Sequence, residues 1–193
     1  MSDFDWYRKA SKHKEMEDWF EKRTKTHIDL VGEYCKKVYD LNPIHFKEIL
    51  DRAKIHDKSK FKNPERDPYI WITWKYKVEK DGKKLEIPED MKEDMNAVTN
   101  IHCKNNRHHP EFHTDQTGNL INMENRDKKP DVMVDATKME DLDIAEMVCD
   151  WCAVSKERGS SPKDWADKNV NIRWKFNAHQ KKLIYEFIDN IWE

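Results

Sequence analysis

Residues 42–60 read NPIHFKEILDRAKIHDKSK, and they combine a helix with a pair of metal-binding residue types at its end. Asn42-Pro43 predicts the helix start, with Asn as N-cap and Pro at the first helical position. Apolar residues then recur on one face, and the next positions on that face are His56 and Asp57. We therefore expect an imidazole and a carboxylate to leave the buried face side by side, where both can bind one ion. The apolar positions are Phe46, Ile49, Leu50 and Ala53.

Other histidines and one aspartate fall on apolar helical stripes elsewhere in the chain. His27 continues a stripe from Phe20 to Val38, and His102 continues one from Met91. Asp150 stands among apolar residues at helical spacing in 141–157, and a buried carboxylate needs a partner. The pair His108-His109 follows His102 and precedes Pro110, which ends any helix there. The order along the chain is H … HD … H … HH … D.

The same periodicities predict an all-α fold, a single domain of roughly six helices over residues 1–193. Residues 1–23 read as an N-terminal helical extension, and the aromatic segment 69–76 favours a helix over a strand. Ile87-Pro88-Glu89-Asp90 predicts another helix start, and residues 183–192 a closing helix. Residues 111–138 have no clear period, and we interpret them as a lid or substrate loop.

Composition limits the classes of function. Of 193 residues, 37% are hydrophobic and 38% charged, and four glycines argue against a glycine-rich phosphate cradle. The net charge of −2 provides no basic field for duplex nucleic acid. Without a long apolar run or signal peptide, we expect a cytoplasmic protein. Cys149 and Cys152 form a CxxC inside a helical pattern, which favours buried thiols over redox or zinc use.

The histidines and aspartates predict a metal site. His27, His56, Asp57 and Asp150 would supply neutral imidazoles and carboxylates, a set that suits Mn, Fe, Co, Ni or Zn better than Mg or Ca. An ion held this way activates water and polarises a phosphoryl oxygen. A second ion, bridged by Asp57, or a substrate phosphate would be bound by the remaining three histidines. These are His102, His108 and His109.

This order resembles the HD superfamily of metal-dependent phosphohydrolases, with Lys60 at the spacing of its HDxxK motif. The extra histidines are similar to those of its two-metal branch, which includes the HD-GYP phosphodiesterases. Their spacing is shorter here and the GYP element is missing, so cyclic-di-GMP is not implied. A closer resemblance is to an HD-like family of bacteria and phages with HDxSKF, NRHHPE and EMxCDW blocks. In this chain the blocks are residues 56–61, 106–111 and 146–151.

The resemblance implies hydrolysis of a nucleotide or a related phosphorylated small molecule, and the host cytoplasm as the location if the protein is viral. Because the sequence has no long apolar run, we expect no membrane partner, and a homo-oligomer is left open. Lys60 and Arg107 would neutralise charge on phosphate, although Arg107 can equally form a salt bridge at a helix end. Glu146, one turn before Asp150, would orient a ligand histidine or act as a base, or else remain a surface acid. Arg173 would reach the pocket from the C-terminal part.

Two other functions remain open from the sequence. Some HD-superfamily proteins use histidines and aspartates on two irons for O₂ chemistry, and this chain has enough of both for a di-iron oxygenase. A non-catalytic metal-stabilised nucleotide-binding protein would use the same residues without turnover. Iron content and an O₂ requirement separate the first from a hydrolase, and tight ligand retention without product identifies the second.

Overall fold

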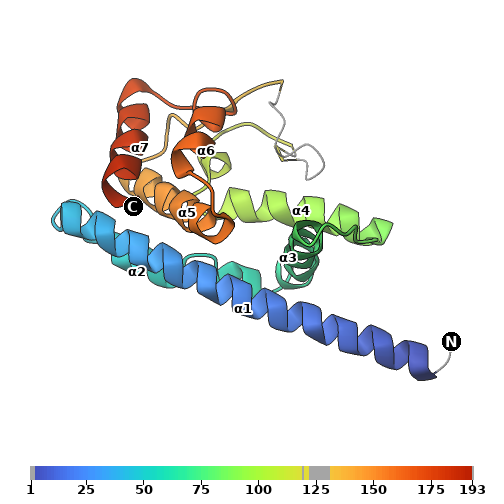
Figure 1. Cartoon of the computed structure of the whole chain (residues 1–193). Coiled ribbons are helices and arrows are strands. Elements are labelled where there is room, and N and C mark those ends of the chain that lie inside the picture. Colours follow the sequence, from blue (N-terminus) through green and yellow to red (C-terminus); the bar gives the residue numbers. More distant parts are fainter. Residues whose placement is uncertain (1–2, 119, 122–130, 193) are drawn as a thin grey trace.

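A computed structural model describes residues 3–118, 120–121 and 131–192, with residues 3–11 described by backbone alone. The fold is all-α, as predicted, and none of its described helices has the length and apolarity needed to cross a membrane. Seven α-helices lie in the described part of the chain, one more than the rough expectation (Figure 1). They are α1 (Asp3–Leu41), α2 (Ile49–Ile55), α3 (Arg66–Lys80), α4 (Glu89–Asn105), α5 (Asp141–Arg158), α6 (Pro162–Asn169) and α7 (Ala178–Ile191).

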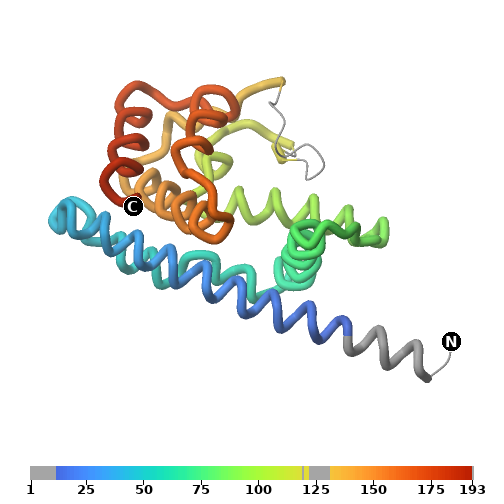
Figure 2. The backbone as a smooth tube through the Cα atoms, in the orientation of Figure 1, coloured from blue at the N-terminus to red at the C-terminus, as the bar shows by residue number. Residues whose placement is uncertain are grey.

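Helix α1 is the central packing element of the described fold. It packs against α2, α3, α5 and α7, and the chain turns at its end so that α2 runs back along it (Figure 2). The helical interpretation of residues 3–23 is confirmed, and the helix continues unbroken through the stripe that contains His27. Since one rigid helix contacts most of the others, it fixes their positions relative to His27.

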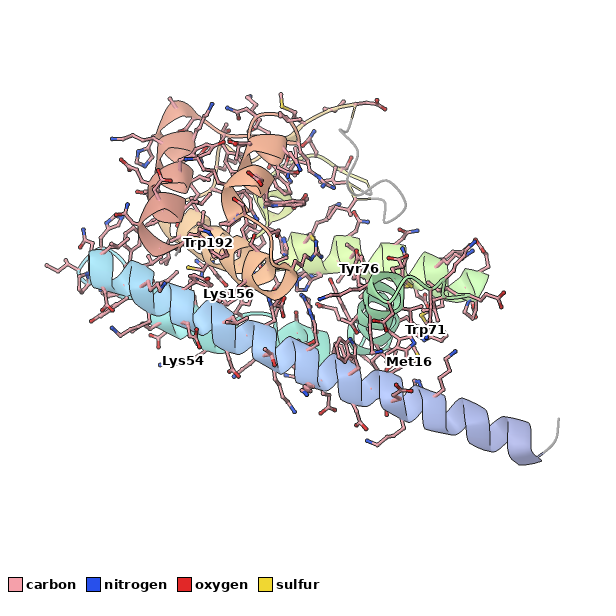
Figure 3. All side chains as sticks on the ribbon, viewed as in Figure 1. Met16, Lys54, Trp71, Tyr76, Lys156 and Trp192 are labelled. Atoms are coloured by element: carbon pink, nitrogen blue, oxygen red, sulfur yellow. The ribbon has the colours of Figure 1, made fainter. Side chains whose placement is uncertain are left out.

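Two apolar clusters make up the core. The larger gathers α5 and α7 against the C-terminal half of α1, and includes Val31. The smaller lies where α3 and α4 meet the N-terminal half of α1, and includes Phe20; Figure 3 shows Met16 and Trp71 close together there. His27 stands between Phe20 and Val31 on α1. A polar layer is therefore buried at the junction of the two clusters.

The central helix α5 has defined ends. A reciprocal capping box between Glu140 and Asp143 opens it, and Gly159 closes it in the left-handed conformation at φ 66°. Almost all of its middle is buried, which explains why the predicted stripe around Asp150 reads so clearly. The helix thereby brings Glu146 and Asp150 into the interior.

A small parallel pairing joins two distant segments. Strand β1 (Val134–Asp135) pairs with β2 (Trp174–Lys175), with Val134 opposite Trp174. The strands tie the end of the 111–138 segment to the C-terminal part of the chain. Residues 119 and 122–130 of the segment interpreted as a lid lie outside the described residues, so that interpretation stays a prediction.

The helix start at Asn42-Pro43 is wrong. Asn42 does cap a turn, because its side chain accepts from the His45 amide at 3.1 Å. The turn does not continue, since the Ile49 amide bonds to the Phe46 carbonyl only three residues back, and α2 begins at Ile49. The predicted helices at 69–76 and from Glu89 are confirmed as α3 and α4.

Candidate metal centre

Asp57 is the centre of the site. It follows His56, the C-cap of α2, and adopts the left-handed conformation with φ 55°, which Asp tolerates better than most residues. This reversal of the backbone points the carboxylate inward, and only 1% of the residue is exposed. Lys60, in the short 3-10 helix η1 (Lys58–Phe61), donates to Oδ2 of Asp57 at 2.5 Å. The predicted burial of the HD pair is confirmed.

Four histidines surround this carboxylate through their Nε2 atoms. His27 and His56 lie 3.7 and 3.8 Å from Oδ2. His102 and His108 lie 3.1 and 3.8 Å from Oδ1. Each oxygen of Asp57 thus faces two imidazoles, a geometry in which one carboxylate can bridge two sites.

The opposite ring nitrogen of each of these histidines faces a carboxylate, and in His56 and His102 a hydrogen bond to that carboxylate fixes the orientation of the ring. Glu146 serves two of them, Glu65 and Glu157 one each. The Nδ1-to-oxygen distances are 2.9 Å for His56–Glu146, 3.4 Å for His108–Glu146, 2.7 Å for His102–Glu65 and 3.4 Å for His27–Glu157. Imidazoles oriented in this way by carboxylates are typical of histidine metal ligands.

Several buried polar atoms at the centre make no hydrogen bond. They are Nε2 of His56 and of His109, together with Nε2 of His102 and Oδ1 of Asp57, which lie 3.1 Å apart without hydrogen-bond geometry. A buried polar atom without a partner costs free energy, so a cluster of them calls for an explanation. A cation shared among these lone pairs provides one, and their nitrogen and oxygen chemistry fits a divalent transition metal.

The ligand atoms form two groups, of which the second has the predicted composition and the first lacks the predicted Asp150. His27, His56 and Asp57 bring one ligand atom each within 4.8 Å of one another, and so do His102, His108 and His109. Two further groups that meet this distance share some of these residues. They are His56, His108 and Glu146, and Cys103, His109 and Glu111.

Asp150 joins the first group through His27. Its Oδ1 lies 3.0 Å from the Nε2 atom of His27, and its side chain is 18% exposed, facing the pocket described below. Although burial opposes ionisation, the hydrogen bond with His27 holds the pKa of Asp150 well below its usual range. Burial alone would lower the pKa of His27, but Asp150 and Glu157 raise it to about 9.

Unlike the protonated His27, the remaining groups are in charge states that favour cation binding. Burial opposes the ionisation of Asp57 and Glu146, yet Lys60 and His56 hold the pKa of Asp57 low, and the bonds to His108 and His56 do so for Glu146. Burial and the neighbouring imidazoles lower the pKa of His108 and His109. Ionised carboxylates and neutral imidazoles are the states that bind metal.

A pocket opens beside the centre. Its wall includes Asp57, Asp150 and the three histidines of the second group, with Lys60 beside them. Aromatic residues form another part of the wall, among them Tyr76, Trp165 and Trp174. Arg173 lines it as predicted, and its guanidinium lies 5.3 Å from the centre of the Trp174 ring.

Two predicted substrate residues lie elsewhere than on the pocket wall. Arg107 binds Asp143 through two bonds of 2.9 Å, which is the salt-bridge alternative at the start of α5. Glu146 orients His56 rather than lying on a helix surface, and its second oxygen accepts from Arg52 at 2.7 Å. Cys149 is a buried thiol, and burial raises its pKa well above the ordinary value.

The sequence did not point to Glu65, Glu157, Arg23 or Arg158. Glu65 reaches His102 from 37 residues away, in a segment with no periodic signal. Glu157 falls seven residues after Asp150, two turns along α5, so helical spacing predicts that it lies on the same face. The contact between Glu157 and His27 could not be predicted from the sequence, because that contact depends on how α1 and α5 pack.

Comparisons with curated proteins and with solved structures give no significant match. The family model of DUF5662, described as a family of unknown function, matches residues 4–190. That range includes every residue of the metal centre and of the pocket wall. The chain therefore belongs to the DUF5662 family.

Proposed function

We propose that this protein is a metal-dependent phosphohydrolase that acts on a nucleotide or a related phosphorylated small molecule. The observation that carries the proposal is the convergence of four imidazoles on Asp57, with unpaired buried atoms, beside a pocket that Asp57 lines together with arginines. The resemblance of the motifs to HD phosphohydrolases points to the same chemistry.

The residues fit one or two divalent transition ions. His27, His56 and Asp57 would hold the first, with Asp150 at its edge. His102, His108 and His109 would hold the second, with Asp57 shared between them. When bound, such ions lower the pKa of a coordinated water and polarise a phosphoryl oxygen.

The side chains have separate tasks in this reaction. Lys60 lines the pocket beside Asp57, where its ammonium can neutralise charge that develops on a phosphate oxygen. Glu146, held by Arg52, keeps two imidazoles in fixed orientations, so these rings need not reorganise during turnover. Arg173 presents a guanidinium to the pocket, and guanidinium groups match phosphate geometry through paired N–H donors.

The test is phosphate release from a panel of nucleotides and sugar phosphates, with Mn, Co or Fe added to the purified protein. Asp57→Asn is the inactivating variant, and Asp51→Asn is its matched control because the side chain of Asp51 is 76% exposed and pairs with the nearby Lys54. We expect metal-dependent release by the wild type and by Asp51→Asn, and loss in Asp57→Asn. Release that persists in Asp57→Asn would refute the proposal.

The same samples test the alternatives. A carboxylate between two histidine groups also suits a pair of irons, so a di-iron oxygenase predicts iron with O₂ consumption and no phosphate release. A binding protein predicts a nucleotide retained through gel filtration without product.

A further inference from the structure

The pocket has a second polar region besides the metal centre. Three arginines line it, Arg23 from α1, Arg158 from the last turn of α5, and Arg173 from the segment before β2. They come from parts of the chain that are distant in sequence, and all three line this one pocket. We call these three residues the arginine group.

Helix geometry places Arg23 and Arg158 away from the metal centre, in the same direction. Helices α1 and α5 pack together and run in opposite senses (Figure 1), so moving toward the N-terminus of α1 means moving toward the C-terminus of α5. Arg23 precedes His27 by one turn, about 6 Å along the axis, and Arg158 follows Asp150 by two turns, about 12 Å. Glu157 confirms the alignment, since it contacts both Arg23 at 3.0 Å and His27.

Arg23 and Arg158 differ in how their charges are compensated. Arg23 is paired with Glu157, whereas no carboxylate pairs with Arg158 among the residues that the structure describes. The guanidinium of Arg158 lies 5.8 Å from the centre of the Tyr76 ring, which is labelled in Figure 3. Such stacking holds a guanidinium plane while its edge donors remain directed elsewhere. A cation in a concave site with spare donors suits an anion.

We propose that the arginine group is a second anion subsite, and that the natural ligand carries two anionic groups joined by a spacer. One group lies at the metal centre and the other, a phosphate or a carboxylate, lies at the arginines. The first half rests on the proposed function, whereas the second half depends on the arginines alone. Tyr76, Trp165 and Trp174 would line the path of the spacer, and flat or apolar spacers fit such walls.

The test uses alkylene bisphosphonates of increasing chain length and the alkylphosphonates of the same lengths, because carbon–phosphorus bonds resist hydrolysis. Binding is measured by calorimetry on wild-type protein, with and without Mn. Arg158→Ala removes the unpaired guanidinium. Arg66→Ala is the matched control, since Arg66 is paired with Glu17 as Arg23 is with Glu157 and does not line the pocket.

We expect the best bisphosphonate to bind Mn-loaded wild type at least about 10-fold more tightly than its matched monophosphonate, as one charge-assisted bond provides. The preference should rise with spacer length to an optimum, disappear in Arg158→Ala and persist in Arg66→Ala. An equal preference in Arg158→Ala and wild type overturns the subsite, and so does its absence in wild type.

The two proposals fail separately. If the protein binds no metal, a bisphosphonate affinity that Arg158→Ala abolishes still supports the subsite, whereas no binding overturns it. If metal binds and phosphate is released without any preference for two anionic groups, the subsite alone is wrong.

Discussion

Replacing Glu146 by Gln tests how the histidines are oriented. The wild-type carboxylate contacts His56 at 2.9 Å and His108 at 3.4 Å through one oxygen, and Arg52 at 2.7 Å through the other. Glutamine keeps the shape but removes the charge. The amide can also turn its NH₂ toward Arg52 or toward an imidazole, and either contact is unfavourable. We expect both rings to lose their fixed orientation and the basicity that a carboxylate gives a ligand.

The magnitude follows from the number of rings that share the carboxylate. Loss of one partner that orients a metal ligand costs about 10- to 100-fold in metal affinity, which is about 1.4 to 2.7 kcal/mol. Glu146 contacts two histidines, so the loss of metal affinity in Glu146→Gln should be near 100-fold. Glu65 contacts His102 alone among these histidines, at 2.7 Å, so the loss of metal affinity in Glu65→Gln should be near 10-fold.

The assay is competition for Mn or Zn against a chelator of known affinity, at constant pH, with circular dichroism to confirm folding. Glu186→Gln is the control, because Glu186 is 52% exposed on α7, and it should bind metal as the wild type does. Wild-type affinity in a folded Glu146→Gln protein would refute the assignment of these histidines as ligands.

Three further predictions concern protonation, thiol burial and backbone conformation. His27 in the metal-free protein has its pKa raised to about 9, so its charge stabilises the apo fold fully below its unfolded pKa of about 6.5, and that contribution disappears as the pH rises through 9. A metal must displace this proton, so the metal affinity should rise about 10-fold per pH unit from about pH 7 to about 9. Calorimetry in buffers of different ionisation enthalpy measures the proton release. The absence of proton release would contradict this prediction. Burial raises the pKa of Cys152 to about 12, so iodoacetamide should label it only after unfolding in urea, and equal native and unfolded rates would be inconsistent with its burial. Gly159→Ala should lower the free energy of unfolding by about 1 kcal/mol because φ is 66° there. Gly32→Ala within α1 should instead raise the free energy of unfolding by about 0.5–1 kcal/mol. If urea denaturation gives the same sign of change for both variants, this reasoning is wrong.

The long helices were predictable because their apolar stripes are also their buried faces. Phe20 and Val31 on α1, and Met147 on α5, are all almost fully buried, so the periodic signal and the packing agree. The helix start predicted from the Asn42 cap is wrong because later hydrogen bonds in this turn connect residues three apart, such as Ile49 and Phe46. No residue type in the segment predicts that change. Helix α6 carries few apolar residues, which is why no stripe marked it.

The candidate metal centre was predictable to the extent that the residues that could bind the ion lie on those stripes. His27, His56, Asp57 and Asp150 converge because each lies on a buried face near the junction of the two clusters. Of the carboxylates that face their rings, Glu146 was predicted, whereas Glu65 and Glu157 could not be predicted because their contacts depend on tertiary packing across dozens of residues.

Arg107 shows the same limit. Its guanidinium could serve a phosphate or an acid, and only the position of Asp143, buried at the start of α5, decides between them.

The most direct test is the metal content of the purified protein by mass spectrometry, for wild type, Asp57→Asn and the exposed control Asp51→Asn. We predict one or two transition-metal ions per chain in the wild type and in Asp51→Asn, and little or none in Asp57→Asn, because Asp57 faces both histidine groups. Wild-type protein that takes up no Mn, Fe, Co, Ni or Zn after reconstitution, or an Asp57→Asn variant that retains its full metal content, would contradict the existence of this centre.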